Sequence, residues 1–216
     1  MLFDLDGTLV DSAPDLFAAL ASLRAQRGLA PLEYESLRHY ASRGAMGMIE
    51  AGFDDQPGLE RETLRKEFLE YYAGNLWVDS KPFDGVEQAL DQLAEKGLGL
   101  AVVTNKITRL AQPLVRAAGW QERFQCVIGG DTTAFPKPHP APVLEACRRL
   151  GVHPGEVLMV GDDVRDIQAG QRAGSLTAAA TWGYIAPGEE PPNWGADFLL
   201  TQPSETAIII NKTNGI

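Results

Sequence analysis

The sequence predicts an α/β fold in which a parallel sheet is flanked by helices and a small all-helical domain is inserted after the first strand. From position 80 onward, short apolar runs alternate with amphipathic stretches, a pattern typical of βαβ units. Between positions 12 and 79 the periodicity is helical, and we find no strand pattern there. Before both, the apolar residues 1–3 read as a short first strand. The expected core is therefore Rossmann-like.

The predicted insert, residues 12–79, opens with strong helix signals. Ser12, Pro14 and Asp15 are typical of a helix start, and Gly28 ends that helix. The helical pattern then continues to about Tyr72. We expect a helical cap domain over this range.

Residues 1–11 and 80–216 form the predicted core domain. Their apolar runs are continuous, as in strands buried on both faces of a parallel sheet. The expected elements are helix 86–96, strand 98–104, helix 108–118, a strand around 126–128, helix 142–150, strand 157–160, helix 164–173 and a short strand at 176–180.

Composition narrows the function classes. The 216 residues are 44% hydrophobic and 22% charged, as in globular proteins, and they suffice for one sizeable domain or a core with an insert. A formal net charge of -10 argues against nucleic acid and anionic membrane as partners. We expect a small-molecule substrate and a monomer or homodimer.

Two cysteines, Cys126 and Cys147, are too few for a disulfide framework and lack metal-ligand spacing. We expect buried free thiols in a reducing compartment. The sequence shows neither a signal-peptide pattern nor an apolar run of roughly 20 residues. A cytoplasmic location is therefore expected.

Asp4 and Asp6 follow the first strand, and residues two apart in an extended chain face the same way. Gly7 then permits a sharp turn. Asp-Gly is also a common turn dipeptide, so the pair could be ordinary turn acids. The alternative is a site in which one carboxylate attacks an electrophile and its neighbour carries a proton, beside a metal cation.

Other polar residues also follow predicted strands, and the carboxyl ends of parallel strands meet where ligands bind in such sheets. They are Thr104 with Asn105, Lys137 between two prolines, and the run Gly161-Asp162-Asp163-Val164-Arg165-Asp166. Carboxylates, a hydroxyl and an ammonium suit phosphoryl transfer, and Mg²⁺ is the cation that oxygen ligands of this kind prefer.

Each residue also has a plainer interpretation. Thr104 could simply fill a strand, and loop lysines such as Lys137 are usually solvated. For Asp163 a helix cap is the favoured interpretation. Asp166 lies four residues after Asp162, so it could orient the metal ligands or Lys137.

In order, Asp4-Leu5-Asp6-Gly7-Thr8, Val103-Thr104-Asn105, Lys137 and the 161–166 run resemble the four motifs of the haloacid dehalogenase-like superfamily. The resemblance covers essentially the whole chain, and the insert matches the cap of that family. It implies a Mg²⁺-dependent phosphatase of a small phosphorylated metabolite.

The resemblance also implies roles for single residues. Asp4 would be the nucleophile that forms an aspartyl-phosphate, and Asp6 the general acid and base. Asp4, the backbone carbonyl of Asp6 and Asp162 would bind Mg²⁺. The remaining expected roles are substrate binding by Thr104, Asn105 and Lys137, and support of the metal ligands by Asp166 and Asp163.

Residues 9–16 and 137–142 are similar to phosphoglycolate phosphatases, whereas 41–45, 102–106 and 183–197 are also similar to N-acetylmuramic acid 6-phosphate phosphatases. We expect 2-phosphoglycolate as substrate, with the amino sugar phosphate as the alternative. Arg43 could bind a substrate carboxylate, which both candidates carry, or be a solvated surface residue.

Two further functions stay open on this fold: a sugar phosphomutase and a catalytically idle binding protein. The presence of both acids, the lysine and the metal carboxylate favours the phosphatase.

Overall fold

A computed structural model describes residues 1–213. Six strands of this part form one parallel sheet in the order β5-β4-β1-β6-β7-β8. Their bounds are β1 Leu2–Phe3, β4 Ala101–Val103, β5 Cys126–Ile128, β6 Leu158–Gly161, β7 Leu176–Ala180 and β8 Phe198–Leu200. The predicted parallel sheet is confirmed. Strand β1 lies between β4 and β6.

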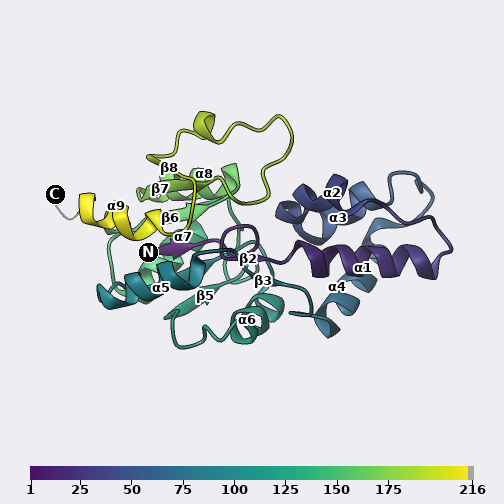
Figure 1. Ribbon diagram of the computed structural model, residues 1–216, viewed down its shortest axis with the longest axis horizontal. Coiled ribbons are helices and arrows are strands. Elements are labelled where there is room, and N and C mark those ends of the chain that lie inside the picture. Colours follow the sequence, from purple (N-terminus) through teal and green to yellow (C-terminus); the bar gives the residue numbers. More distant parts are fainter. Residues whose placement is uncertain (214–216) are drawn as a thin grey trace.

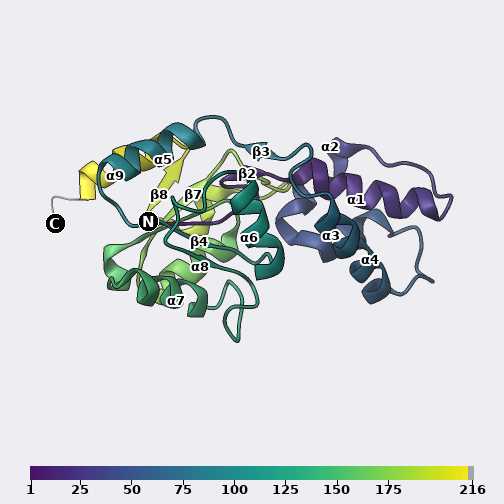
Figure 2. The ribbon, with the colours of Figure 1, turned by 90° about the horizontal axis from the view of Figure 1, so that it is seen from below.

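Helices cover both faces of the sheet because successive residues of each strand point to opposite faces. Leu2 of β1 packs in one apolar cluster with residues of α7 and α8, whereas Phe3 packs in the other with residues of α5, α6 and α9. Figure 2 shows α5 and α9 on one side of the sheet and α7 and α8 on the other. The helices are α5 Val86–Glu95, α6 Thr108–Ala117, α7 Ala141–Leu150, α8 Val164–Ala173 and α9 Glu205–Thr213.

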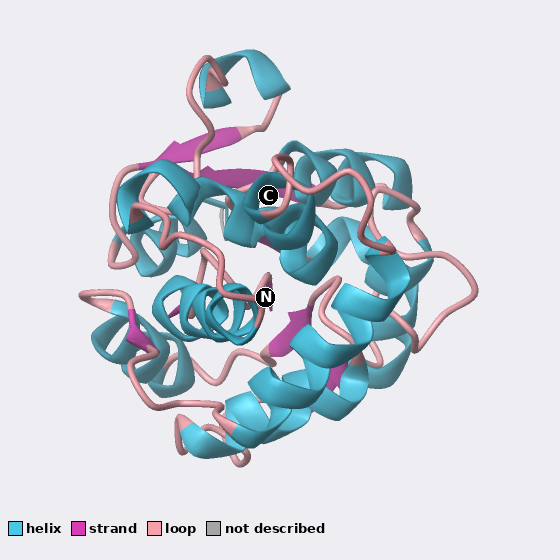
Figure 3. Ribbon diagram, turned by 90° about the vertical axis from the view of Figure 1, so that its right-hand side faces the viewer, coloured by secondary structure: helices cyan, strands magenta, loops and turns pink. Residues whose placement is uncertain are grey.

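The insert forms a separate helical body at one end of the molecule (Figure 1). Its elements are α1 Ala13–Gln26, α2 Tyr34–Leu37, the 3₁₀ helix η1 Arg38–Arg43, α3 Gly44–Gly52 and α4 Arg61–Gly74. An apolar cluster that includes Leu20, Phe53 and Phe68 holds these helices together, and Leu110 and Tyr184 of the core also belong to it. Figure 3, in which this end faces the viewer, shows helices surrounding the strands.

A two-stranded antiparallel ribbon joins the insert to the core. Its strands are β2, Val10–Asp11, and β3, Lys81–Pro82, which lie on either side of the insert in sequence. Neither was expected from the sequence, because two residues carry no readable alternation.

Several predicted boundaries were wrong. The apolar run 98–104 contributes only Ala101–Val103 to the sheet, since its partners β1 and β5 are themselves short. Strand β8 and helix α9 were missed. Cys126 is half-buried, not buried as expected, whereas Cys147 is buried; both are free. Among residues 1–213, no helix combines the length and the apolar character that crossing a membrane requires.

The start of α1 differs from the expected cap. The Ser12 side chain makes no cap hydrogen bond and donates to Asp6 instead. Asp15 is buried, and its carboxylate accepts hydrogen bonds from the backbone N–H groups of Val78, Asp79 and Ser80 at 2.8 to 3.1 Å. One side chain thus ties the two ends of the insert together.

Replacing this side chain should destabilise the protein. We expect Asp15→Ala to lower the free energy of unfolding by about 3 kcal/mol, because three backbone N–H groups and the buried Ser80 hydroxyl lose their acceptor. Urea unfolding measures the change. The exposed Asp84→Ala variant is the control and should stay within about 0.5 kcal/mol of the wild type. Equal stability of the two variants would contradict this account of the junction.

Candidate functional site

The acid pair lies at the carboxyl end of β1, where the chain makes a tight turn. Gly7 has φ +89°, and a Cβ at this position would lie 2.1 Å from Oδ2 of Asp162. Glycine is therefore required both by the backbone conformation and by the close approach of the turn to Asp162. Asp4 and Asp6 line the same cavity but contact different partners.

Lys137 is a buried cation beside Asp4. Its Nζ lies 2.9 Å from Oδ1 of Asp4 and 2.6 Å from Oδ1 of Asp166, and it donates a hydrogen bond to the backbone carbonyl of Val103. The side chain is only 2% exposed, and burial of an ammonium is tolerated when it is paired and hydrogen-bonded in this way. The structure therefore makes Lys137 a fixed counter-charge instead of a solvated loop lysine.

Asn105 holds the backbone of Lys137. Its Nδ2 donates to the Lys137 carbonyl and its Oδ1 accepts from the Lys137 N–H, both at 2.9 Å. Thr104 is 2% exposed, and its Oγ1 accepts a hydrogen bond from the N–H of Lys106. Both residues line the cavity, and the Asn105 amide also positions the lysine loop.

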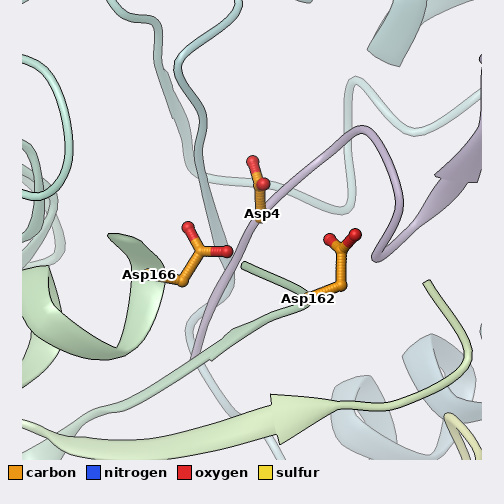
Figure 4. Close-up of side chains that lie close together, drawn as sticks. All are labelled: Asp4, Asp162 and Asp166. Atoms are coloured by element: carbon orange, nitrogen blue, oxygen red, sulfur yellow. The ribbon is translucent and has the colours of Figure 1, made fainter. Parts of the chain in front are cut away.

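Asp4, Asp162 and Asp166 form one acidic cluster (Figure 4). One carboxylate oxygen from each lies within 4.8 Å of the others. Asp162 accepts hydrogen bonds from Thr8 Oγ1 at 2.7 Å and from the Tyr184 N–H at 2.9 Å, which fix its orientation. Three carboxylates thus lie close together, and the Lys137 ammonium pairs with two of them, Asp4 and Asp166.

This arrangement raises the pKa values of two acids. Burial, followed by repulsion from Asp4 and Asp166, raises the pKa of Asp162 well above its ordinary value. Burial raises the pKa of Asp166 to about 7, and Lys137 opposes that rise. A cation that replaces these protons would relieve the repulsion. Clustered carboxylate oxygens are the donors that Mg²⁺ prefers, so the residues fit this ion.

Asp6 has a different environment. Its Oδ1 accepts a hydrogen bond from Ser12 Oγ at 2.5 Å and lies 2.9 Å from Nζ of Lys106. The Lys106 side chain is 7% exposed. Asp6 is thus held at the wall of the cavity, apart from the acidic cluster.

Asp163 caps α8, as favoured from the sequence, because its side chain accepts a hydrogen bond from the N–H of Arg165. Its carboxylate also pairs with the guanidinium of Arg165 through two contacts of 2.7 Å. Arg165 in turn donates to the backbone carbonyl of Ser42, in the insert, at 2.8 Å. The 161–166 segment of the core is therefore in direct contact with the insert beside the site.

The cavity has a volume of about 220 Å³ and lies between the core and the insert. Its acidic end contains Asp4 and Asp6. The insert contributes Arg43 and apolar side chains to its wall, and the chain after β4 adds further apolar ones. Arg43 is more than half exposed, and its guanidinium lies 3.6 Å from the Glu50 carboxylate.

Sequence reasoning gave no separate role to Lys106, Arg165 or Tyr184. Lys106 lies within residues 102–106 and Arg165 within residues 161–166, and their position in these motifs is the sequence feature that could have identified them. Tyr184 lies in a loop far along the chain, and its contact with Asp162 comes only from folding.

Metal binding should depend on pH. In the folded protein without metal, Asp162 and Asp166 keep their protons to a higher pH than they do in the unfolded chain, because folding raises their pKa values above the ordinary 3.8. Stability of the metal-free protein therefore falls as pH rises from about 4 through 7. Because Mg²⁺ binds the deprotonated acids, the increase in the Tm of the protein on addition of Mg²⁺ should be larger at pH 8 than at pH 6.

Differential scanning fluorimetry with and without Mg²⁺ measures this difference. Asp162→Asn is the matched variant, and its Tm should respond little to Mg²⁺ at either pH. A wild-type response that is independent of pH would contradict the linkage.

Comparison with known proteins agrees with this geometry. The family model for haloacid dehalogenase-like hydrolases matches residues 1–174. An N-acetylmuramic acid 6-phosphate phosphatase of Pseudomonas aeruginosa is 41% identical over 215 residues, which cover 98% of this chain and 94% of that protein. A phosphoglycolate phosphatase of Xylella fastidiosa is 45% identical over 203 residues, covering 94% and 89%.

Among solved structures, one described as a predicted phosphoglycolate phosphatase from Haemophilus somnus has a TM-score of 0.86 at 30% identity. The match covers 97% of this chain and 96% of that one. The family model and these near full-length relatives lead to one conclusion: the chain belongs to the haloacid dehalogenase-like hydrolases.

Proposed function

We propose that this phosphatase hydrolyses phosphate monoesters of small, carboxylate-bearing metabolites through an aspartyl-phosphate formed on Asp4. The observation that carries the proposal is the meeting of Asp4, Lys137 and Asp162 from three distant parts of the chain: Asp4 and Lys137 form an ion pair in the cavity lining, and Asp162 lies beside Asp4 in the acidic cluster. Such a site offers a nucleophile, a fixed positive charge and a place for a metal, which are the requirements of phosphoryl transfer.

In the first step, a carboxylate oxygen of Asp4 attacks phosphorus, and the bond from phosphorus to the ester oxygen breaks. Asp6 donates a proton to the departing alkoxide. In the second step, Asp6 takes a proton from water, and the hydroxide oxygen attacks phosphorus, so that inorganic phosphate leaves and Asp4 is restored. Lys137 compensates negative charge throughout, and Thr104 donates its hydroxyl to a phosphoryl oxygen.

Mg²⁺, when bound, supplies further positive charge for the phosphoryl oxygens. Asp4, the backbone carbonyl of Asp6 and Asp162 would hold it. Asp166 supports this arrangement through its contact with Lys137, and Asp163 supports it by capping the helix that carries Asp166.

The insert, residues 12–79, is proposed to act as a cap domain on a core of residues 1–11 and 80–216. The cap forms one wall of the cavity, and closure over the site would exclude water from the reacting groups. The narrow ribbon of β2 and β3 provides the connection about which the cap would move.

2-Phosphoglycolate is the first candidate substrate. The relative from Xylella fastidiosa with that name is 45% identical. In this proposal Arg43 binds the carboxylate of the substrate, because a guanidinium pairs well with a carboxylate. The phosphoryl group of the substrate lies against Lys137.

N-acetylmuramic acid 6-phosphate is the second candidate, and a specific observation favours it. The cavity lining includes the apolar side chains of Leu16, Met46, Leu69, Ile107 and Leu110. Glycolate has no apolar group large enough to cover them, whereas the amino sugar carries lactyl and acetyl methyl groups. A second, more open cleft that shares Arg43 and Arg165 adjoins the cavity and would accommodate a larger leaving group.

Phosphate release with Mg²⁺ tests the mechanism and separates the substrates. We expect kcat to fall by roughly 10⁴-fold or more in Asp4→Asn, since the nucleophile is lost. Both candidate esters are assayed, and the larger kcat/KM identifies the better substrate. Circular dichroism of the variant serves as the folding control. Activity that survives in folded Asp4→Asn protein would mean that the nucleophile is misassigned.

Arg43→Ala should raise KM for the better carboxylated substrate by about 10- to 100-fold, because a charge-assisted hydrogen-bonded pair is lost. With p-nitrophenyl phosphate, which has no carboxylate, KM should stay within about twofold. Arg43→Lys keeps the charge without the two-pronged geometry and should lie between. Equal effects on both substrates would remove Arg43 from carboxylate recognition.

A further inference from the structure

Lys106 is a buried ammonium that the mechanism above does not use. Its Nζ lies 2.9 and 3.2 Å from the two carboxylate oxygens of Asp6. Its backbone is fixed at both ends, since its N–H donates to Thr104 Oγ1 at 3.1 Å and its carbonyl accepts from the Gly130 N–H at 2.9 Å. The ammonium is therefore aimed at Asp6 from a rigid loop of the core.

The other side of this ammonium is covered by the insert. Nζ of Lys106 lies 4.5 Å from the centroid of the Tyr72 ring, which belongs to α4. Tyr72 is fully buried, and its hydroxyl has no hydrogen-bond partner within residues 1–213. The ring face is what Tyr72 offers, and an aromatic face attracts a desolvated cation.

Asp6 is thus held by one group from each side of the junction. Lys106 comes from the core, and Ser12, which donates to Oδ1 of Asp6, lies where the insert begins. The Tyr72 ring excludes water from one side of the Lys106–Asp6 pair, so removing the ring would let water compete with Asp6 for the ammonium.

We propose that Lys106, held beneath the Tyr72 ring, is a positioning residue that fixes the Asp6 carboxylate in the orientation from which it serves the leaving group. This inference rests on the proposed role of Asp6 as general acid.

The test uses two phosphate esters that differ in their need for a proton. An alkyl phosphate, the better of the two candidate substrates, leaves as an alkoxide and needs the acid. 2,4-Dinitrophenyl phosphate leaves as a stabilised phenolate and does not. The measured quantity is kcat/KM, because it reports the formation of the aspartyl-phosphate and not its hydrolysis.

For Lys106→Met we expect kcat/KM to fall by about 100-fold with the alkyl ester, the lower range for loss of general acid catalysis, and by less than about threefold with the dinitrophenyl ester. Tyr72→Leu should also lower kcat/KM more for the alkyl ester than for the dinitrophenyl ester, but to a smaller degree. Tyr72→Phe, which keeps the ring, should behave like the wild type. The exposed Lys66→Met variant controls for loss of a lysine.

Equal losses with both esters, or no loss with either, would overturn the inference, since Lys106 would then act on phosphate binding, on folding or not at all. Tyr72→Leu decides the question if Lys106→Met does not fold. Asp6→Asn distinguishes failure of the proposed role of Asp6 from failure of the proposed role of Lys106. If that variant lacks the selectivity, the proposed role of Asp6 fails; if it shows the selectivity and Lys106→Met does not, only this inference fails.

Discussion

The ion pairs of Lys137 with Asp4 and Asp166 are the constraint on which the rest of the structure depends. The Lys137 ammonium and the Asp166 carboxylate are almost fully buried. Buried charges are stable only when their partners are close and well oriented, so the elements that carry them must meet accurately. Asp4 follows β1, Asp166 lies in the first turn of α8, and the Val103 carbonyl at the end of β4 accepts from the same ammonium.

The junction with the insert is connected to this charged site. Tyr184 donates its backbone N–H to Asp162 and its hydroxyl to Asp11 of β2, each at 2.9 Å. Arg38 of the insert contacts the same Asp11 at 3.1 Å, and its guanidinium lies 4.9 Å from the Tyr184 ring. These contacts connect the insert, through Asp11 and Tyr184, to the Asp162 carboxylate of the acidic cluster.

The two acids after β1 show why spacing alone does not define a site. Residues two apart were expected to face one pocket, and both do line the cavity. Their partners nevertheless differ, since Asp4 contacts Lys137 while Asp6 contacts Lys106 and Ser12. This difference matches the two chemical roles proposed for them, because a nucleophile has to face the metal and the phosphorus whereas an acid has to face the leaving group.

Local sequence determined the parallel sheet, the helices with strong apolar periodicity such as 164–173, and the residues that stand at strand ends. Each of these follows from neighbouring residues, since apolar periodicity and turn residues act over a few positions. Only the tertiary structure decided that Ser12 bonds to Asp6 instead of capping α1, that Asp15 closes the insert, and that Lys106 lies between Asp6 and the Tyr72 ring. These contacts join residues far apart in the chain, and burial, which removes competing water, makes such pairings favourable only after the core and the insert have packed.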